Sequence, residues 1–152
     1  TSLPARRSGW AVRATVTRVA GAPVALRGLA ADRPWEGRVI EAPHMIQAEG
    51  RYLMFYAGND YGGARYAAGY AVCDGPAGPC RDAPENPLLH SDDGAGVVGP
   101  GHPAVFRHAG RTWIAYHGWR PARDGRPQAR YRAMYIDRLD WADGRPVVRR
   151  HR

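Results

Sequence analysis

Hydrophobic and polar positions alternate with a period of about two along most of the chain, which is the spacing of β-strands. Residues 51–57 (RYLMFYA) and 112–118 (TWIAYHG) are the clearest strands. Aromatic and β-branched side chains are also dense in residues 39–46, 66–73, 102–108 and 131–139. No stretch combines helix caps with a helical stripe. The pattern therefore predicts an all-β, antiparallel fold.

Turn-forming pairs separate these strands, as the high content of 19 glycines and 13 prolines suggests. The pairs are Glu49-Gly50, Ala109-Gly110, Asp124-Gly125 and Asp143-Gly144. Pairs of this type favour tight hairpins. We therefore expect consecutive strands to pair with each other.

The sequence also repeats itself, because residues 42–58 can be laid over residues 102–118. The matching pairs are Pro43/Pro103, Gly50/Gly110, Arg51/Arg111, Tyr56/Tyr116 and Gly58/Gly118. Each copy predicts a strand, a tight turn and a second strand, and a third strand follows at residues 68–72 and 133–137. A unit of three or four strands is typical of a β-propeller blade. A chance similarity between two hairpins is the alternative.

The repeat divides the chain into a blade at 39–98, a blade at 99–148 and a basic tail at 149–152. Residues 1–38 are interpreted as remnant outer strands of a preceding blade. Closed propellers have about four to eight blades, and an open arc exposes strand edges. The chain is therefore expected to be the C-terminal part of a larger propeller, completed by missing N-terminal blades or by a second chain.

The formal net charge is +8, from 22 Lys+Arg against 14 Asp+Glu, and every basic residue is Arg. Arg-only usage in an Ala-, Gly- and Pro-rich chain is typical of a GC-rich genome. Without a basic helix or a reader motif, we expect no nucleic-acid partner. No apolar stretch approaches the roughly 18 residues that cross a bilayer, so no membrane partner is expected.

The two cysteines, Cys73 and Cys80, flank the turn-forming sequence Asp-Gly-Pro-Ala-Gly-Pro. Such a segment can fold back and bring the two sulfurs together, which favours a disulfide over two free thiols. A metal pair is disfavoured, because no second Cys/His pair has ligand spacing. A disulfide suits a secreted or extracellular protein, although the chain contains no signal peptide.

Several segments together resemble glycoside hydrolase family 43, the five-bladed propeller glycosidases. Residues 35–44 (WEGRVIEAPH) resemble the region around the family's general acid. Further segments match in the same order as in the family, so that the resemblance covers about residues 10–148. These segments are residues 52–61, 69–72, 78–79, 98–102 (VGPGH), 116–119 and 132–141. The family includes arabinanases, arabinofuranosidases and xylosidases that hydrolyse with inversion.

The resemblance makes Glu41 the general acid. Its place at the start of an inner strand, beside Ile40 and Pro43, would partly desolvate a carboxyl group and raise its pKa; a rim carboxylate paired with an arginine is the alternative. Inversion also needs a general base on the opposite face of the bond. The family's base and its pKa-tuning carboxylate come from the first two blades, which are not in this sequence.

The resemblance implies four further roles. It places His102 at the propeller axis, where a calcium or other ion can lie, although no cofactor is required; a buried structural histidine is the alternative. It points Arg132 toward the sugar, although an ordinary strand arginine is equally compatible. Trp35, Asn59 and Tyr61 could form part of the sugar platform. His44 and His117 are expected to be structural or rim residues.

The expected function is therefore part of an inverting glycoside hydrolase that acts on arabinose- or xylose-containing polysaccharides. The chain would supply the acid but lack the base, and would be a poor catalyst alone. Two alternatives stay open: a non-catalytic carbohydrate-binding module with a degenerate half-propeller, and a structural β-domain that self-associates to cover its edges.

Overall fold

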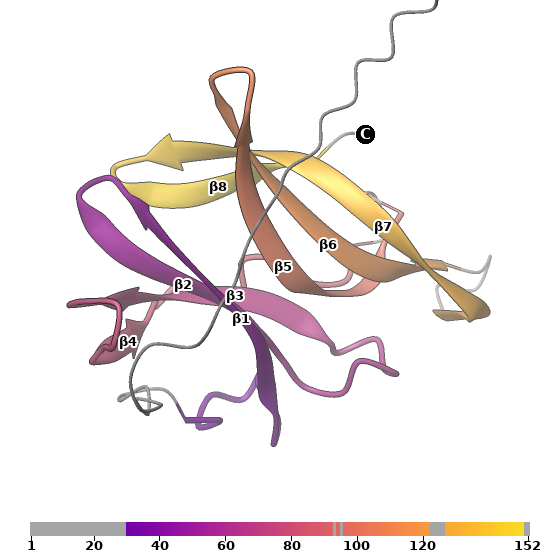
Figure 1. Ribbon diagram of the computed structural model, residues 1–152. Coiled ribbons are helices and arrows are strands. Elements are labelled where there is room, and N and C mark those ends of the chain that lie inside the picture. The colour runs from indigo at the N-terminus through magenta and orange to yellow at the C-terminus, as the bar shows by residue number, and fades with distance from the viewer. Residues whose placement is uncertain (1–29, 93, 95, 122–126, 151–152) are drawn as a thin grey trace, which may run out of the picture.

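The computed structural model describes residues 30–92, 94, 96–121 and 127–150, which form two four-stranded antiparallel sheets (Figure 1). In each sheet the strands follow one another in chain order. The first sheet contains β1 (Ile40–Ala48), β2 (Arg51–Gly58), β3 (Ala67–Cys73) and β4 (Cys80–Asp82). The second contains β5 (Val98–His108), β6 (Arg111–Pro121), β7 (Pro127–Ala142) and β8 (Arg145–Arg149). The predictions of an all-β fold and of a partial propeller are confirmed.

Three predicted turns form the hairpins between strands. Their central residues all have positive φ: Glu49 and Gly50 at 51° and 71°, Ala109 and Gly110 at 48° and 74°, and Asp143 and Gly144 at 50° and 70°. Two consecutive positive φ values define the turn whose twist matches that of paired strands. Asp124-Gly125 lies outside the described residues.

The observed strands are longer and more numerous than the alternation predicted. β5 begins at Val98 rather than residue 102, because register shifts interrupt its pairing on either side of Gly101 and hide the period of two. The fourth strands, β4 and β8, are short and were not assigned from sequence. Of residues 1–38, which were expected to supply remnant outer strands, residues 1–29 lie outside the described residues and residues 33–38 form bends and turns.

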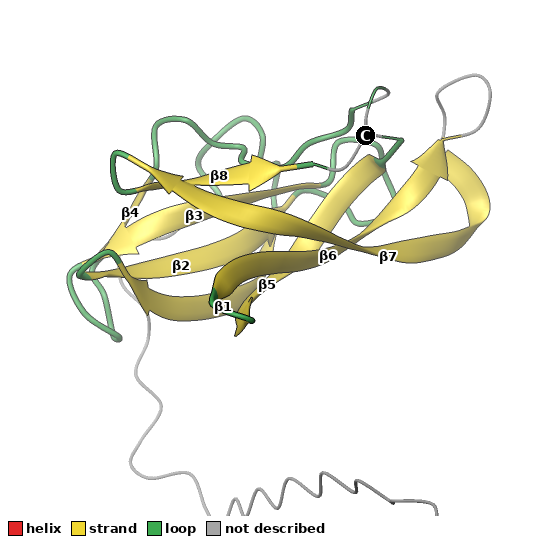
Figure 2. Cartoon of the chain, turned by 90° about the horizontal axis from the view of Figure 1, so that it is seen from above, coloured by secondary structure: helices red, strands yellow, loops and turns green. Residues whose placement is uncertain are grey.

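The sequence repeat is also a repeat of backbone shape. Ala42 in β1 and His102 in β5 both precede a proline, and their φ values are 54° and 56°. Each lies at a register shift against the neighbouring strand. Such irregularities bend a strand and redirect the side chains around them. The two bent strands, β1 and β5, lie side by side (Figure 2).

The main hydrophobic core lies between the two sheets. Leu53 and Phe55 of β2 are fully buried against Ile114 and Leu139 of the second sheet. The intervening positions of β2, Met54 and Tyr56, point to the opposite face, as the alternation of a strand requires. There they form a second cluster with partly buried Trp35. The first sheet is thus covered on both faces.

The described residues cover the second sheet on one face only. Side chains on its other face are largely exposed, with Phe106 at 41%, Met134 at 74% and Ile136 at 43%. This apolar surface is called the free face below and consists of Ala104, Phe106, Trp113, Ala115, Met134 and Ile136.

Cys73 and Cys80 form the predicted disulfide. They face each other at the first pair of the β3–β4 ladder, so that the bond closes the intervening loop. In the part of the chain that is described, no helix is long and apolar enough to cross a membrane.

Candidate functional site

Glu41 lies at the start of β1, paired with Ala57, and its carboxylate is half-buried. Oε1 of Glu41 accepts a hydrogen bond of 2.5 Å from the hydroxyl of Tyr66, which lies just before β3. Tyr66 is fully buried. Burial, followed by the hydrogen bond to Glu41, raises the pKa of Tyr66, so this hydroxyl keeps its proton and remains a donor. The partner of Glu41 is therefore a tyrosine, not the arginine considered as an alternative.

Tyr66 holds its place because Gly101 has no side chain. A Cβ atom at Gly101 would overlap the Tyr66 ring. In the repeat, Gly101 is the counterpart of Glu41, since the two positions lie 101 − 41 = 60 residues apart. Where the first blade carries the carboxylate, the second blade leaves a gap. The aromatic ring that positions the carboxylate fills that gap.

Arg132 of β7 lies over the ring of the same tyrosine. Its guanidinium carbon lies 5.2 Å from the centroid of the Tyr66 ring and 5.0 Å from that of Trp119. It donates hydrogen bonds of 2.5 Å to Nδ1 of His117 and to the carbonyl oxygens of Tyr61 and Gly99. A fourth bond, of 3.2 Å, reaches the carbonyl of His117. Of its five N–H groups, one on Nη1 has no acceptor among the described residues.

His117, which was expected to be a structural or rim residue, lies in the same cluster. Its ring stacks on Tyr66 with centroids 5.9 Å apart, and its Nδ1 accepts the bond from Arg132. Burial, then the positive charge of Arg132 and the proximity of His102, lower the pKa of His117 to about 4. The imidazole is therefore neutral at pH 7. Burial likewise lowers the pKa of Arg132.

His102 is exposed, and its ring centroid lies 5.6 Å from that of His117. The one group of three metal-capable side chains in the described part of the chain is elsewhere: Asp32, Glu36 and Asp82. Calcium takes six to eight oxygen ligands, whereas the nearest ring to His102 offers nitrogen. The described residues around His102 therefore do not fit calcium, and an ion there would need ligands from outside them.

Trp35 and Asn59 lie together on the first blade. The Trp35 ring packs 5.4 Å from that of Tyr56, over glycines 58 and 69, where a Cβ atom would come within 2.9 Å of it. Asn59 donates from Nδ2 to the carbonyl of Trp35 at 3.3 Å. Both residues line a hollow of about 330 Å³ that also contains Tyr66. Glu41 does not line this hollow itself, but Tyr66, which donates to Glu41, does.

Tyr61 contributes its backbone to the cluster. Its carbonyl oxygen accepts bonds from Arg132 and from Nε1 of Trp119, at 2.5 and 3.3 Å, while the side chain is 61% exposed. The structure thus joins Glu41, Arg132, His102 and the Tyr61 carbonyl through Tyr66 and His117.

Other buried carboxylates belong to structural pairs. Tyr56 lies 2.7 Å from Oε1 of Glu36 and 2.8 Å from Oδ1 of Asp82, and Tyr116 donates to Asp137 at 2.6 Å. Burial is the main cause that raises the pKa of both tyrosines. Because Tyr56 and Tyr116 are counterparts in the repeat, this tyrosine–carboxylate contact is part of the blade architecture.

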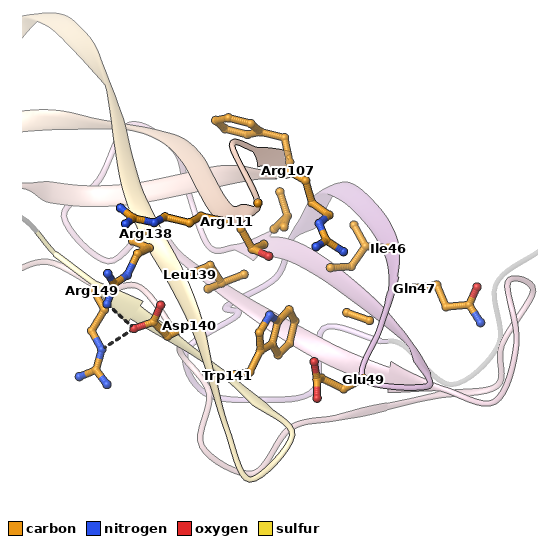
Figure 3. Close-up of a pocket in the computed structure, with 15 residues that line it drawn as sticks. Ile46, Gln47, Glu49, Arg107, Arg111, Arg138, Leu139, Asp140, Trp141 and Arg149 are labelled. Atoms are coloured by element: carbon orange, nitrogen blue, oxygen red, sulfur yellow. Dashed lines mark hydrogen bonds and ion pairs between the residues drawn. The ribbon is translucent and has the colours of Figure 1, made fainter.

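A larger hollow, of about 810 Å³, lies at the opposite ends of the inner strands. It is bounded by the end of β1, the β5–β6 turn and β7 (Figure 3). Residues 41 and 49 are separated by eight residues of extended strand, or roughly 25 Å. The larger hollow is therefore separate from the Glu41 cluster.

Comparisons with known proteins agree with this architecture. The family model described as Glycosyl hydrolases family 43 matches residues 11–146. A thermostable family-43 glycoside hydrolase is similar in structure, with a TM-score of 0.70 and 32% identity over 86% of this chain and 43% of its own. An endo-1,4-beta-xylanase from Bacteroides thetaiotaomicron also gives 0.70 and 32%, over 80% and 42% of the two chains.

An alpha-L-arabinofuranosidase from Lactobacillus brevis shares the fold, with a TM-score of 0.66 and 19% identity over 81% of this chain and 41% of its own. This chain thus spans less than half the length of these solved proteins. A search of curated protein sequences finds no significant match.

Proposed function

Because the chain belongs to glycosyl hydrolases family 43, we propose that it is the C-terminal part of an inverting glycosidase and supplies its general acid, Glu41. The base would come from blades outside the described residues. The proposed substrates are arabinose- or xylose-containing polysaccharides, in keeping with the xylanase and the arabinofuranosidase among the similar structures. The observation that carries the proposal is the hydrogen bond from Tyr66 to Glu41.

This hydrogen bond suits the chemistry of an acid. In an inverting reaction one carboxyl group protonates the departing oxygen, while a second activates water on the opposite face of the sugar. Tyr66 occupies Oε1 of Glu41, so the transferable proton belongs on Oε2. Once the proton has left, the Tyr66 hydroxyl stabilises the carboxylate that remains. The role of Tyr66 is therefore to position and to stabilise Glu41.

Arg132 and His117 pack against Tyr66 and so help to hold its hydrogen bond to Glu41 in place. The cation and the neutral imidazole both lie against the Tyr66 ring, and Arg132 also binds the carbonyls of Tyr61 and Gly99. We propose that Arg132 mainly fixes the loops beside Glu41, and that its remaining N–H faces the sugar. Trp35 and Asn59 would bind a neighbouring sugar unit through the hollow that they share with Tyr66.

The test compares leaving groups. The chain is combined with a polypeptide that carries the N-terminal blades of the thermostable family-43 relative, and hydrolysis of aryl xylosides and arabinofuranosides is followed by NMR. We expect Glu41→Gln to lose at least about 100-fold on a poor leaving group, because general acid catalysis contributes about that much. An activated leaving group, which needs no proton, should react at nearly the wild-type rate.

Asp74→Asn is the matched control, because it removes a carboxylate that pairs with Arg81 at the surface. It should leave both rates unchanged. Equal activity of Glu41→Gln and wild type on the poor leaving group would exclude Glu41 as the acid. Turnover by the chain alone, with inversion, would show that it contains its own base.

A second function is sugar binding without turnover. It is favoured by one observation, namely that the hollow of Trp35, Asn59 and Tyr66 is formed within this chain. Calorimetric titration with xylo- and arabino-oligosaccharides tests it, since binding without product in the complemented sample would support a binding module. We also propose that the protein is secreted, a proposal supported by the disulfide between Cys73 and Cys80.

A further inference from the structure

The larger hollow extends into the space between the two sheets, at the end of the inner strands that lies away from Glu41. The cross-strand pair Arg107 and Thr112 lies two positions beyond the pair Val105 and Ile114, so alternation places both pairs on the same face of the second sheet. Val105 and Ile114 belong to the core between the sheets. Arg107 and Thr112 therefore face the first sheet, at the point where this core ends.

An aromatic ring and a carboxylate line the same hollow. Trp141 of β7 lies on the same face as Leu139 and packs, partly buried, against the core between the sheets. Glu49, in the β1–β2 turn, comes from the first sheet. Figure 3 shows the Trp141 ring, the Arg107 guanidinium and the Glu49 carboxylate around the hollow. Both sheets of this chain thus contribute to one concave surface.

The two charged groups on this surface have no partners. Arg107 and Glu49 make no hydrogen bond or ion pair within the described residues, with each other or with any other side chain. The hollow has a volume of about 810 Å³, which lies within the range of about 300–1,000 Å³ that is typical of ligand pockets. It therefore offers a donor fork, an acceptor and enough room for a ligand that contacts both.

The lining residues carry more positive than negative charge. Four arginines line the hollow together with two carboxylates: Arg107, Arg111, Arg138 and Arg149, with Glu49 and Asp140. Asp140 already pairs with Arg138 at 2.7 Å and with Arg149 at 3.1 Å. Two arginines and one carboxylate are left over. This excess of positive charge in a concave surface favours a ligand with a negative charge.

We propose that the larger hollow binds a sugar unit that carries a carboxylate, namely a uronic acid within an oligosaccharide. Arg107 binds the carboxylate through two parallel N–H bonds. Trp141 stacks on the apolar face of the sugar ring, and Glu49 accepts hydrogen bonds from its hydroxyl groups. The choice of a sugar rests on the proposed function, whereas the site itself lies roughly 25 Å from Glu41 and does not involve it.

An acidic sugar fits these groups better than a chain of phosphates does. The phosphates of a nucleic acid would place repeated negative charges against Glu49 and Asp140. A uronic acid has one carboxylate among several hydroxyl groups, so it fills the arginine fork without bringing a second charge to Glu49. A polysaccharide that is bound here and near Glu41 is held at two sites, and binding at one raises its effective concentration at the other.

The test is an NMR titration of the isotope-labelled chain, alone and combined with the N-terminal blades of the thermostable family-43 relative. The probe is a xylo-oligosaccharide that carries one glucuronic acid unit. We expect the amide signals of residues 47–49, 105–112 and 139–141 to shift. The matched probe has the same carboxyl group reduced to an alcohol. It should bind at least about tenfold more weakly, because it loses the charge-assisted bonds to the arginine.

Variants separate the roles of the proposed groups. Arg107→Ala should bind both probes equally weakly, and Trp141→Leu, which keeps an apolar side chain in the core, should weaken both probes alike. Arg120→Ala changes an exposed arginine that does not line the hollow, and it should bind as wild type does. Unshifted signals in the hollow, or equal affinity of wild type for the two probes, would overturn the proposal. Inorganic phosphate that binds as tightly as the acidic oligosaccharide would overturn the choice of a sugar.

This measurement is independent of turnover. Glu41→Gln should show the same shifts in the larger hollow as wild type, because Glu41 lies at the other end of β1. Shifts in the larger hollow without hydrolysis by the combined sample would contradict only the proposed function. Shifts confined to Trp35, Asn59 and Tyr66 would overturn only the present inference.

Discussion

Tyr66 and Gly101 come from different sheets, yet the ring of the first occupies the space that a side chain on the second would need. The same tyrosine donates to Glu41. The position of the proposed acid therefore depends on a contact between blades, and not on its own strand alone.

Gly101→Ala should accordingly destabilise the chain by about 2–4 kcal/mol, because the added methyl group overlaps a buried ring that cannot move freely. The measurement is urea unfolding. In a Tyr66→Ala background the same substitution should cost much less, since the ring is gone; equal costs in both backgrounds would refute the contact. Gly110→Ala is the control, because a Cβ atom at Gly110 would meet no other atom within 4 Å. Only the strain of its φ of 74° remains, so this substitution should lower the free energy of unfolding by about 1 kcal/mol.

The folded chain should lose stability as the pH falls from about 6.5 to about 4. His117 has a pKa of about 4 in the fold against roughly 6.5 when unfolded. The unfolded state therefore takes up the proton first, and stability falls as the pH falls. The full shift corresponds to about 3 kcal/mol, and partial contact with solvent reduces this to about 1–2 kcal/mol.

Urea unfolding of wild type and His117→Gln between pH 7 and 4 measures this effect. The curve of the variant should be flatter over that range. His108→Gln, which changes an exposed histidine, should retain the wild-type slope. If the stability of His117→Gln falls as steeply with pH as that of wild type, a group other than His117 causes the loss of stability.

Arg132→Lys should destabilise the fold by about 2–4 kcal/mol even in the absence of sugar. A lysine cannot reproduce the fork that serves Nδ1 of His117 and two loop carbonyls, and unpaired buried groups are costly. Unfolding by urea gives the value, with exposed Arg120→Lys as control. If Arg132 only contacted substrate, its replacement would leave stability unchanged and raise KM alone.

Reduction of the Cys73–Cys80 bond should lower the free energy of unfolding by about 2–3 kcal/mol, the entropy of a short closed loop. Unfolding with and without dithiothreitol measures it. The double variant Cys73→Ser/Cys80→Ser should match the reduced protein and be insensitive to the reductant. Stability unaffected by reduction would show that the loop remains closed without the bond.

The blades were predictable because they follow local rules. Alternation in β2 and β6 and the turn pairs at Glu49 and Ala109 mark two hairpins, and the repeat marks them as equivalent. Resemblance then singled out Glu41 and Arg132, and in the structure Glu41 accepts from the Tyr66 hydroxyl while Arg132 lies over the Tyr66 ring. None of this required knowledge of how the sheets pack.

Tyr66 itself could not be found from sequence. It sits at the end of a loop, its partner Glu41 is 25 residues away, and its packing against Gly101 exists only once the two sheets meet. The surroundings of His117 were hidden for a similar reason, because its low pKa comes from burial and then from the charge of Arg132 on the neighbouring strand. One signal in the sequence could have indicated this packing. At the position equivalent to Glu41, the second copy of the repeat has Gly101, which leaves room for a ring.

The contact between the two sheets is head-to-tail, since each uses a different face. Interfaces of this kind close into a ring or continue as an open filament, depending only on the rotation between units. Trp35 packs over the remaining face of the first sheet. A ring built from this arc therefore has to meet the first sheet through Trp35 and the second sheet through its free face.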